Sequence, residues 1–400
     1  MRHHIVHLAQ LAAKAERNIV GLMSGTSLDG LDIAFCTIRG NGRNTQLTLK
    51  QFVTLPYDER FRKEVRKVFS VKHGDIELLV QLHAHIGKLH GQMVNETLST
   101  WGVDKREVDL IASHGQTMYH APSFIHPNSG YANASLQIGD GDHIAMETGL
   151  ITISDFRLKH IAAGGEGAPL AVYGDFLIFS DDHENRIMLN IGGIANFTWL
   201  PSAAFLNAYP GFSTDVGPGN TIMDAYMQKH LGSACDENGV LAASGKVIPQ
   251  LLDTLMNHAF FESAFPKTIG PELFNLEYLE KAMGRAGGSY SHADIMATLN
   301  RFSAEGIIKA IKDSVPEYLN PVVYGSGGGV HNPVLMSHLQ AAFPQTIFRH
   351  TDELGVPADA KEAVLFALLA NECVAGQALG QGLFKAGMPD ISMGKISLPG

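Results

Sequence analysis

The sequence predicts an α/β protein built from two similar lobes. Residues 19–38 read as a short apolar strand, a polar loop rich in Gly, Ser and Asp, and a second apolar strand. Residues 187–200 repeat this order, and the segments between them alternate between apolar strand-like runs and stretches with helical spacing. The repeat indicates a weak internal duplication, with glycine-rich loops from both lobes facing a ligand cleft.

Length and composition agree with a globular protein of two domains. The chain has 400 residues, of which 45% are apolar, so it can bury a sizeable core. Its formal charge of −10 and the lack of a Lys/Arg cluster argue against nucleic-acid or anionic-membrane partners. No apolar run approaches the ~20 residues of a transmembrane helix.

The N-terminus and the cysteines predict the compartment. Residues 1–18 start with a basic residue, but polar residues interrupt their apolar positions, which follow helical spacing. We expect a helical extension here, and secretion is the minor alternative. The three cysteines form no C-x-x-C pair and read as buried thiols in a reducing compartment, which favours the cytoplasm. The nineteen histidines show no H-E-x-x-H or similar spacing, so we predict no zinc site.

The loop at residues 24–30 has the composition of a polyphosphate site. Gly25 and Gly30 can adopt positive φ and let backbone amides approach a ligand closely. Hydroxyls and the carboxylates of Asp29 and Asp32 lie beside them, a mixture that suits phosphate oxygens and a magnesium ion. An ordinary β-hairpin with a Gly-containing turn fits the spacing equally well.

Two further polar segments follow apolar strands in the first half. Residues 108–112 read as a strand that ends in the polar loop Ser113-His114-Gly115-Gln116-Thr117. Residues 151–154 read as a strand that is followed directly by Asp155 and Arg157. Ligands bind at the carboxyl ends of strands in open α/β sheets. The glycine-rich turn at 163–169 then reads as the domain boundary, a hinge beside an acidic side chain.

The second half carries three more candidate loops. They lie at residues 190–196, 214–220 and 325–332, and the last two run into predicted helices. Asp215 and the loop amides next to it would face a helix N-terminus, a natural anion site. The triple glycine 327–329 resembles a nucleotide-contacting turn, although neither a G-x-G-x-x-G fingerprint nor a Walker A loop is present.

Taken together, these motifs resemble one family. The set comprises GLMSGTSLDGLD (21–32), ASHGQT (112–117), LQIGD (136–140), SDFR (154–157), GGEGAPL (164–170), LNIGGIANFTWLP (189–201), TDVGPGN (214–220), AASGKV (242–247), the loop 325–332 and PADAKEAVLFALLA (357–370). It resembles anhydro-N-acetylmuramic acid kinase, of the acetate/sugar kinase, Hsp70 and actin superfamily, over residues 19–400. The resemblance implies two ribonuclease-H-like or actin-like lobes, with mixed sheets flanked by helices around a central cleft.

The resemblance also implies a boundary for each lobe. We expect residues 1–18 to form the helical extension and residues 19–160 the first lobe, joined by the C-terminal segment 365–400. Residues 161–364 would form the second lobe. A homodimer is compatible with this size, but no stretch of the sequence specifies one.

The activity implied is an ATP-dependent kinase that opens 1,6-anhydro-N-acetylmuramic acid with water and phosphorylates O6, in peptidoglycan recycling. In this resemblance Asp155 is the general base that deprotonates the water. ATP and Mg²⁺ are the expected cofactors, with Asp29 and Asp215 as metal ligands. Substrate contacts are expected from His114, Gln116, Arg157 and Glu362. The nucleotide site would comprise Gly25, Thr26, Ser27, Leu28, Asp29, Gly30, Leu31, Asp32, Asn190, Gly192, Gly193, Asp215, Gly217, Gly219, Asn220, Gly327, Gly328 and Gly329.

Several alternatives stay open at the level of sequence. Asp155 could instead be a helix N-cap or the ion-pair partner of Arg157, Asp215 could cap the following helix, and His114 could be structural. The family usually carries Gln where this chain has Glu166, a change that could repel an acidic sugar. It also tends to have Pro and His before Asp175. A kinase for another anhydrosugar, such as levoglucosan, and a non-catalytic nucleotide-binding protein are therefore the rival functions.

Overall fold

A computed structural model describes residues 2–123, 130–168, 170–270, 273–376 and 389–400, without the side chain of residue 358. The chain divides into two compact units. Unit 1 comprises Met1–Phe179 and Gly355–Gly400, and unit 2 comprises Ser180–Leu354. The boundaries therefore differ from the expected ones at both points where the chain passes from one unit to the other. Residues 161–179 and 355–364 belong to unit 1, and the glycine-rich turn at 163–169 lies inside this unit.

Unit 1 is built on a seven-stranded mixed sheet with the order β12-β6-β4-β1-β2-β3, to which β5 adds beside β4. Strands β1, β2 and β3 form an antiparallel meander, while β4 and β6 run parallel to β1. The strands are β1 (Glu16–Ser24), β2 (Gly30–Arg39), β3 (Gln46–Pro56), β4 (Leu110–Ala121), β5 (Ala134–Ile138), β6 (Thr152–Ser154) and β12 (Lys395–Ser397).

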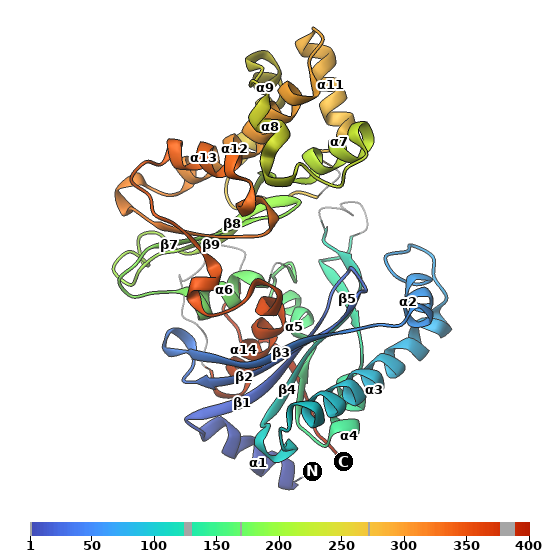
Figure 1. The fold of residues 1–400 in the computed structure, drawn as a ribbon. Coiled ribbons are helices and arrows are strands. Elements are labelled where there is room, and N and C mark those ends of the chain that lie inside the picture. The colour runs from blue at the N-terminus through green and yellow to red at the C-terminus, as the bar shows by residue number, and fades with distance from the viewer. Residues whose placement is uncertain (1, 124–129, 169, 271–272, 377–388) are drawn as a thin grey trace. The chain divides into compact units, whose positions relative to one another are not determined.

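Helices cover the sheet of unit 1. Helix α14 (Lys361–Ala375) packs on β1, β2 and β4, and Figure 1 shows its red ribbon against the blue strands. Gly21 permits this contact, because a Cβ there would lie 2.0 Å from the carbonyl oxygen of Ala363. The remaining helices of the unit are α1 (Arg2–Ala13), α2 (Glu59–Arg66), α3 (Ile76–Trp101), α4 (Gly141–Thr148), α5 (Phe156–Ala162) and α6 (Ala171–Phe179).

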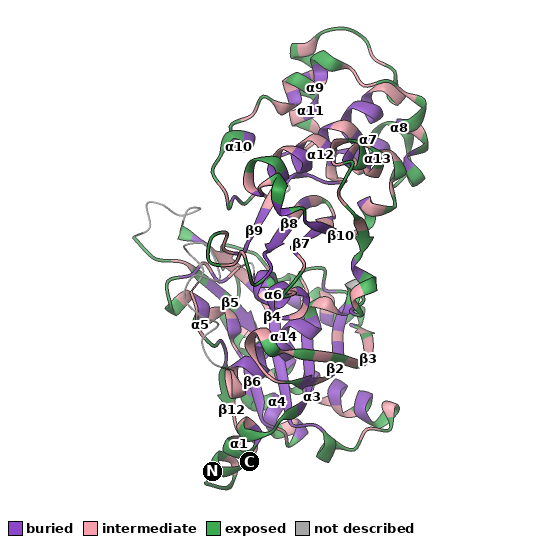
Figure 2. Cartoon of the chain, turned by 90° about the vertical axis from the view of Figure 1, so that its left-hand side faces the viewer, coloured by how far each residue is buried: buried purple, intermediate pink, exposed green. Residues whose placement is uncertain are grey.

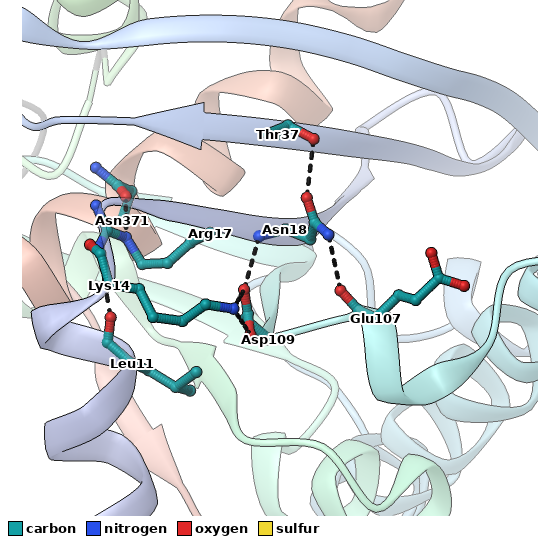
Figure 3. Close-up of polar contacts among 8 residues, drawn as sticks. All are labelled: Leu11, Lys14, Arg17, Asn18, Thr37, Glu107, Asp109 and Asn371. Atoms are coloured by element: carbon teal, nitrogen blue, oxygen red, sulfur yellow. Dashed lines mark hydrogen bonds and ion pairs between the residues drawn. The ribbon is translucent and has the colours of Figure 1, made fainter.

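The predicted helical extension is shorter than expected and is part of unit 1. Helix α1 ends at Ala13, and β1 already begins at Glu16. Lys14 binds the carboxylate of Asp109 at 2.7 Å, and the buried Arg17 donates from Nε to Oδ1 of Asn371 at 2.7 Å (Figure 3). These contacts tie the N-terminal segment to β4 and α14.

Unit 2 repeats the topology of unit 1. Its five-stranded sheet has the order β11-β10-β7-β8-β9, in which β7, β8 and β9 form an antiparallel meander and β10 and β11 run parallel to β7. The order and strand directions match β6-β4-β1-β2-β3, which confirms the duplication indicated by the sequence. The strands are β7 (Arg186–Ile191), β8 (Ile194–Leu200), β9 (Phe212–Pro218), β10 (Val322–Ser326) and β11 (Phe348–His350).

The helices of unit 2 surround a separate hydrophobic core, which includes Phe197, Phe212, Phe302 and Ile307. In Figure 2 most residues of β4, β8 and β10 have the colour of buried residues, whereas β3 is intermediate or exposed along its whole length. Helix α12 (His292–Ser314) packs against β8 and β9 and contacts α8 and α13. The other helices are α7 (Thr221–Leu231), α8 (Val240–Ser244), α9 (Pro249–Met256), α10 (Ala259–Glu262), α11 (Leu276–Ala286) and α13 (Pro333–Ala342).

Short 3₁₀ helices complete the chain. They are η1 (Gly42–Asn44), η2 (Lys105–Glu107), η4 (Glu237–Gly239), η5 (Glu317–Leu319), η6 (Gly328–His331), η7 (Thr351–Leu354) and η8 (Ala358–Ala360). Among the described residues, no helix is long and apolar enough to cross a membrane. The three cysteines are free, and Cys235 is exposed rather than buried as expected.

Candidate functional site

The β1–β2 loop of unit 1 presents the polar groups that the sequence assigned to phosphate and metal. Thr26, Ser27 and Asp29 are exposed, and the Asp29 carboxylate accepts from the Ser27 hydroxyl at 2.6 Å. That hydrogen bond lowers the pKa of Asp29, so the carboxylate is ionised at neutral pH. An exposed, ionised carboxylate beside hydroxyls fits a hard divalent cation such as Mg²⁺.

The apolar residues of the same loop have another role. The side chains of Leu28 and Leu31 are buried in the core of unit 1, so only their backbone groups can face a ligand. Leu28 has a left-handed backbone with φ of 58°, a conformation that is costly for a non-glycine residue. Gly30 and Asp32 lie on β2, and Asp32 accepts from the Thr54 hydroxyl at 2.6 Å. Burial raises the pKa of Asp32, and nearby Asp29 and Asp359 add to the rise.

The segment Ser113–Thr117 is strand rather than loop. Strand β5 pairs with β4 from Gln116 onward and extends the ladder to Ala121. Within this strand Gly115 has a φ of 73°, and a Cβ on Gly115 would lie 2.6 Å from the carbonyl oxygen of Ile138. The polar residues are consequently buried inside unit 1.

His114 and Gln116 therefore position neighbouring groups. His114 Nε2 accepts from Arg157 Nε at 2.9 Å, which leaves Nδ1 to donate to the carbonyl of Gly115 at 2.9 Å. Burial, with the Arg157 charge, lowers the pKa of His114 to about 3, so the ring is neutral. Both ring nitrogens are occupied, and the side chain of Gln116 is bonded to the loop around Ser24. Neither residue offers a ligand the polar atoms that the sequence analysis assigned to substrate.

Arg157 is the centre of a charged cluster. Its guanidinium holds His114 and the carbonyl of Gly167, at 3.1 Å, so two of its five N–H groups are used within the described residues. Glu362, at the first turn of α14, is exposed, yet protein atoms around its carboxylate desolvate it and raise its pKa, while Arg157 opposes the rise. Arg157 and Asp32 thus lie close enough to Glu362 within unit 1 to act on it electrostatically.

The glycine-rich turn at 163–169 is wrapped around His160. The Gly167 amide donates to His160 Nδ1 at 2.9 Å, and a Cβ on Gly165 would lie 2.2 Å from the ring. Burial lowers the pKa of His160 to about 4. Glu166 is half-buried beside this turn, and burial raises its pKa. Residue 169 lies outside the described residues.

Asp155 has a different environment from the one expected. It precedes α5 with φ of 56°, makes no side-chain capping bond, and accepts from Lys395 Nζ at 3.0 Å. Lys395 belongs to β12, which pairs antiparallel with β6. Asp155 therefore occupies the N-cap position of α5 without capping it through its side chain, and it pairs with Lys395 rather than with Arg157. It also borders a polar cavity of about 20 Å³ together with Ser154, His114 and Gln137.

In unit 2 the predicted loops are packed on one another. The amides of Gly219 and Asn220 donate to the carbonyls of Gly193 and Gly192 at 2.8 Å, and that of Thr221 donates to Gly193 at 3.2 Å. These amides, which the sequence assigned to an anion, instead join the two loops. A Cβ on Gly219 would lie 2.1 Å from the carbonyl oxygen of Gly192, so only glycine permits the contact.

The third loop of unit 2 joins the same cluster. Gly327 and Gly329 pack on Ile191, where Cβ atoms would lie 2.7 Å from its carbonyl oxygen and 2.2 Å from its side chain. Ser326 Oγ lies 3.4 Å from Asn190 Oδ1, and Gly328 faces the side chain of Asn220. The three glycine-rich loops of the second half thus contact one another within unit 2.

Asp215 lies on β9 beside Gly217, not at the start of α7. Its Oδ2 accepts from the Ile269 amide at 2.8 Å, and its own amide donates to the carbonyl of Lys267 at 2.9 Å. The N-cap of α7 is Asn220, so Asp215 does not cap the helix. Burial raises the pKa of Asp215 to about 6. A carboxylate with this pKa is well matched to accept a proton near neutral pH.

The duplicated mixed sheet with glycine-rich loops defines a protein of two ribonuclease-H-like, actin-like units. The sequence model of the anhydro-N-acetylmuramic acid kinase family matches residues 17–380. The chain is 52% identical to the anhydro-N-acetylmuramic acid kinase of Pseudoalteromonas atlantica, with 100% of each chain covered. It is 50% identical to that of Pseudoalteromonas translucida, with 99% of each covered, and 35% identical to that of Caldanaerobacter subterraneus, with 98% and 99% covered. The chain belongs to the anhydro-N-acetylmuramic acid kinase family.

Proposed function

We propose that this protein uses ATP and water to convert 1,6-anhydro-N-acetylmuramic acid into N-acetylmuramic acid 6-phosphate, as a cytoplasmic step of peptidoglycan recycling. The observation that carries the proposal is the family match over residues 17–380. Two features support it. Unit 2 has three glycine loops packed into one cluster, and unit 1 has an exposed hydroxyl-and-carboxylate loop beside a cluster of Arg157 and carboxylates.

The reaction needs one carboxylate to accept a proton from water. The water oxygen bonds to the anomeric carbon, the bond from that carbon to O6 breaks, and O6 takes the γ-phosphoryl group as ADP leaves. Mg²⁺ bound to the nucleotide would neutralise phosphate charge, and Asp29 is the candidate that best fits such an ion. The residues around Arg157 would hold the sugar and exclude other water.

Asp215 is the stronger candidate for the proton acceptor. The resemblance implied Asp155 for this role, but the Asp155 carboxylate is engaged in an ion pair with Lys395 at 3.0 Å. Asp215 is partly desolvated, and its pKa of about 6 keeps it basic yet ionised at pH 7. We therefore assign proton transfer to Asp215 and a positioning role to Asp155.

The test is turnover of the anhydrosugar by matched Asp→Asn variants. Asp215→Asn should lower kcat by about 10²- to 10⁴-fold while ATP binding, measured by calorimetry, persists. Asp155→Asn should retain more activity, and the exposed Asp142→Asn should behave as wild type. A larger loss of kcat in Asp155→Asn than in Asp215→Asn would return the role to Asp155. Wild-type protein that binds ATP but forms no sugar 6-phosphate would refute the kinase assignment.

A second candidate substrate follows from Glu166. A half-buried carboxyl in the turn held by Arg157 is an unusual neighbour for the lactyl carboxylate of the muramic acid. Levoglucosan, which lacks that carboxylate, is therefore assayed in parallel. A higher kcat/KM for levoglucosan than for the muramic substrate would change the substrate but not the reaction class.

A further inference from the structure

Tyr57 contacts both ends of the β1–β2 loop. It follows β3 directly and is 5% exposed. Its backbone amide donates to the carbonyl of Asp29 at 3.0 Å, at the end of the loop. Its hydroxyl lies 2.8 Å from Ser24 Oγ, at the start of the loop. One residue from a neighbouring strand thus spans the loop that the proposed function assigns to ATP.

The hydroxyl belongs to a chain of hydrogen bonds whose directions are fixed by Gln116. The Gln116 amide nitrogen donates to the carbonyls of Gly25 and Thr117, at 3.1 and 3.2 Å, so its Oε1 must face Ser24. The Ser24 hydroxyl therefore donates its only proton to Gln116 Oε1, at 2.5 Å. Its oxygen can then only accept a hydrogen bond from the hydroxyl of Tyr57.

The chain ends at a buried histidine. Because Tyr57 donates to Ser24, its oxygen must accept from His90 Nε2, which is 2.8 Å away. His90 is fully buried, and burial lowers its pKa to about 3, so it is the neutral Nε2–H tautomer. Its Nδ1 is then an acceptor, and within the described residues it has no partner. An unpaired acceptor costs less than an unpaired donor would, which agrees with this direction.

Within the described residues, few hydrogen bonds lie inside the loop itself. Leu28 donates to the carbonyl of Gly25 at a long 3.4 Å, and the Ser27 hydroxyl donates to Asp29. Leu28 keeps its left-handed backbone because its side chain is anchored in the core. The β1–β2 ladder, which ends at the pair Met23 and Asp32, holds the two strands together, and Tyr57 and Gln116 add the bonds that fix Ser24 and the Gly25 carbonyl at the start of the loop. Phosphoryl transfer depends strongly on such positioning, since an error of about 1 Å can cost 10²-fold in rate.

We propose that Tyr57 is a positioning residue for ATP: its hydroxyl, aligned by His90, fixes Ser24, Gly25 and Gln116 so that the loop amides and hydroxyls meet the phosphates. This role rests on the proposed function of the loop. Tyr57 and His90 do not contact the nucleotide themselves, and they act through Ser24 and Gln116.

The test compares variants of the full-length protein in ATP titrations and steady-state kinetics. Tyr57→Phe should raise the KM and Kd for ATP about tenfold or more, with little change in the KM for the sugar. Tyr278→Phe is the control, because it also removes a hydrogen-bonded hydroxyl, a part-buried one that donates to the carbonyl of Leu255 in unit 2. It should leave the KM for ATP unchanged. A Tyr57→Phe variant with both ATP constants within twofold of wild type would overturn the proposal.

Variants of His90 separate positioning from stability. His90→Gln keeps a donor near the Nε2 position and should retain the wild-type KM for ATP, whereas His90→Leu should raise it. The double variant Tyr57→Phe/His90→Leu leaves no unpaired donor at this place, so it should regain stability but keep the high KM for ATP. A double variant with wild-type ATP affinity would refute the positioning role. Wild-type protein that does not bind ATP would refute the proposed function and this role with it.

Discussion

At the scale of single residues, environment rather than position in the sequence distinguishes the two candidate bases. In the sequence, Asp155 follows an apolar strand and Asp215 lies in a loop before a predicted helix, and both read as ligand-facing carboxylates. The structure surrounds Asp215 with protein and gives it one amide donor, whereas Lys395 neutralises Asp155. Desolvation raises the pKa of Asp215, whereas the Asp155 carboxylate is engaged by Lys395, so the two groups are suited to different roles.

The raised pKa of Asp215 predicts a dependence of stability on pH. Because its folded pKa of about 6 exceeds the ordinary 3.8, the folded state binds the proton more tightly than the unfolded state. Stability from this group is present at low pH and is lost as the pH rises from about 4 through 6. At pH 8 the charged, buried group costs up to about 3 kcal/mol.

Asp215→Asn removes this cost. The variant should be more stable than wild type at pH 8, and the difference should shrink toward zero at pH 4, as measured by urea unfolding. The exposed Asp142→Asn serves as control, since it should show no comparable gain. A stability difference that is the same at both pH values would mean that Asp215 is not desolvated. Greater stability with lost turnover would be a trade-off common at active sites.

At the scale of elements, glycines decide how closely helices and loops approach the sheets. Gly21 lets α14 lie on β1, and Gly219 lets the loop after β9 lie on the β7–β8 loop. In the sequence, both appear only as members of glycine-containing motifs. Their actual role is the absence of a Cβ at a backbone contact between segments far apart in the chain.

We predict that Gly21→Ala destabilises unit 1 by about 3 kcal/mol or more. The new methyl group would meet the Ala363 carbonyl at 2.0 Å, and neither backbone can move without disturbing a buried element. Denaturant unfolding measures the loss. Gly284→Ala in α11 is the matched control, because no atom lies within 4 Å of its Cβ position and alanine favours a helix interior. It should be neutral or stabilising, and equal losses in both variants would contradict the packing argument.

At the scale of the whole molecule, the chain contains the same sheet topology twice. Each unit has its own core, and the chain passes between the units at residues 179–180 and 354–355. The ribonuclease-H-like order of strands in both units explains why candidate loops recur after corresponding strands: the β1–β2 loop and the β7–β8 loop follow the first strand of each unit.

Binding of ATP should stabilise the protein as a whole. At a concentration of MgATP 100 times its Kd, mass action adds about 2.7 kcal/mol to the free energy of unfolding, which a rise in Tm reports. Removal of Mg²⁺ with EDTA should abolish turnover, and added Mg²⁺ should restore it. ATP that raises the Tm equally with and without Mg²⁺ would argue against Asp29 as a metal ligand. GTP provides the comparison for nucleotide selectivity.

The sequence by itself determined the α/β class, the duplication, the loops and the family. Each of these depends on local patterns, namely the period of the apolar residues, the spacing of the glycines and the order of the motifs. It did not predict the unit boundary at residue 179 or the extension of β4 through Gln116. Both depend on which segments, distant in the chain, pack against or pair with these residues. The pairing of β12 with β6 likewise joins segments that are far apart in the chain. Strand pairing of this kind carries almost no local signal.

Only the tertiary structure decided what each site residue does. It showed that His114 and Gln116 are occupied by neighbours, that Lys395 pairs with Asp155 across 240 positions of the chain, and that Asp215 has a pKa of about 6. It also revealed Tyr57 and His90, which belong to none of the motifs recognised in the sequence. The physical reason is that charge, tautomer and pKa are set by burial and by partners in space, and a linear pattern of residues does not contain them.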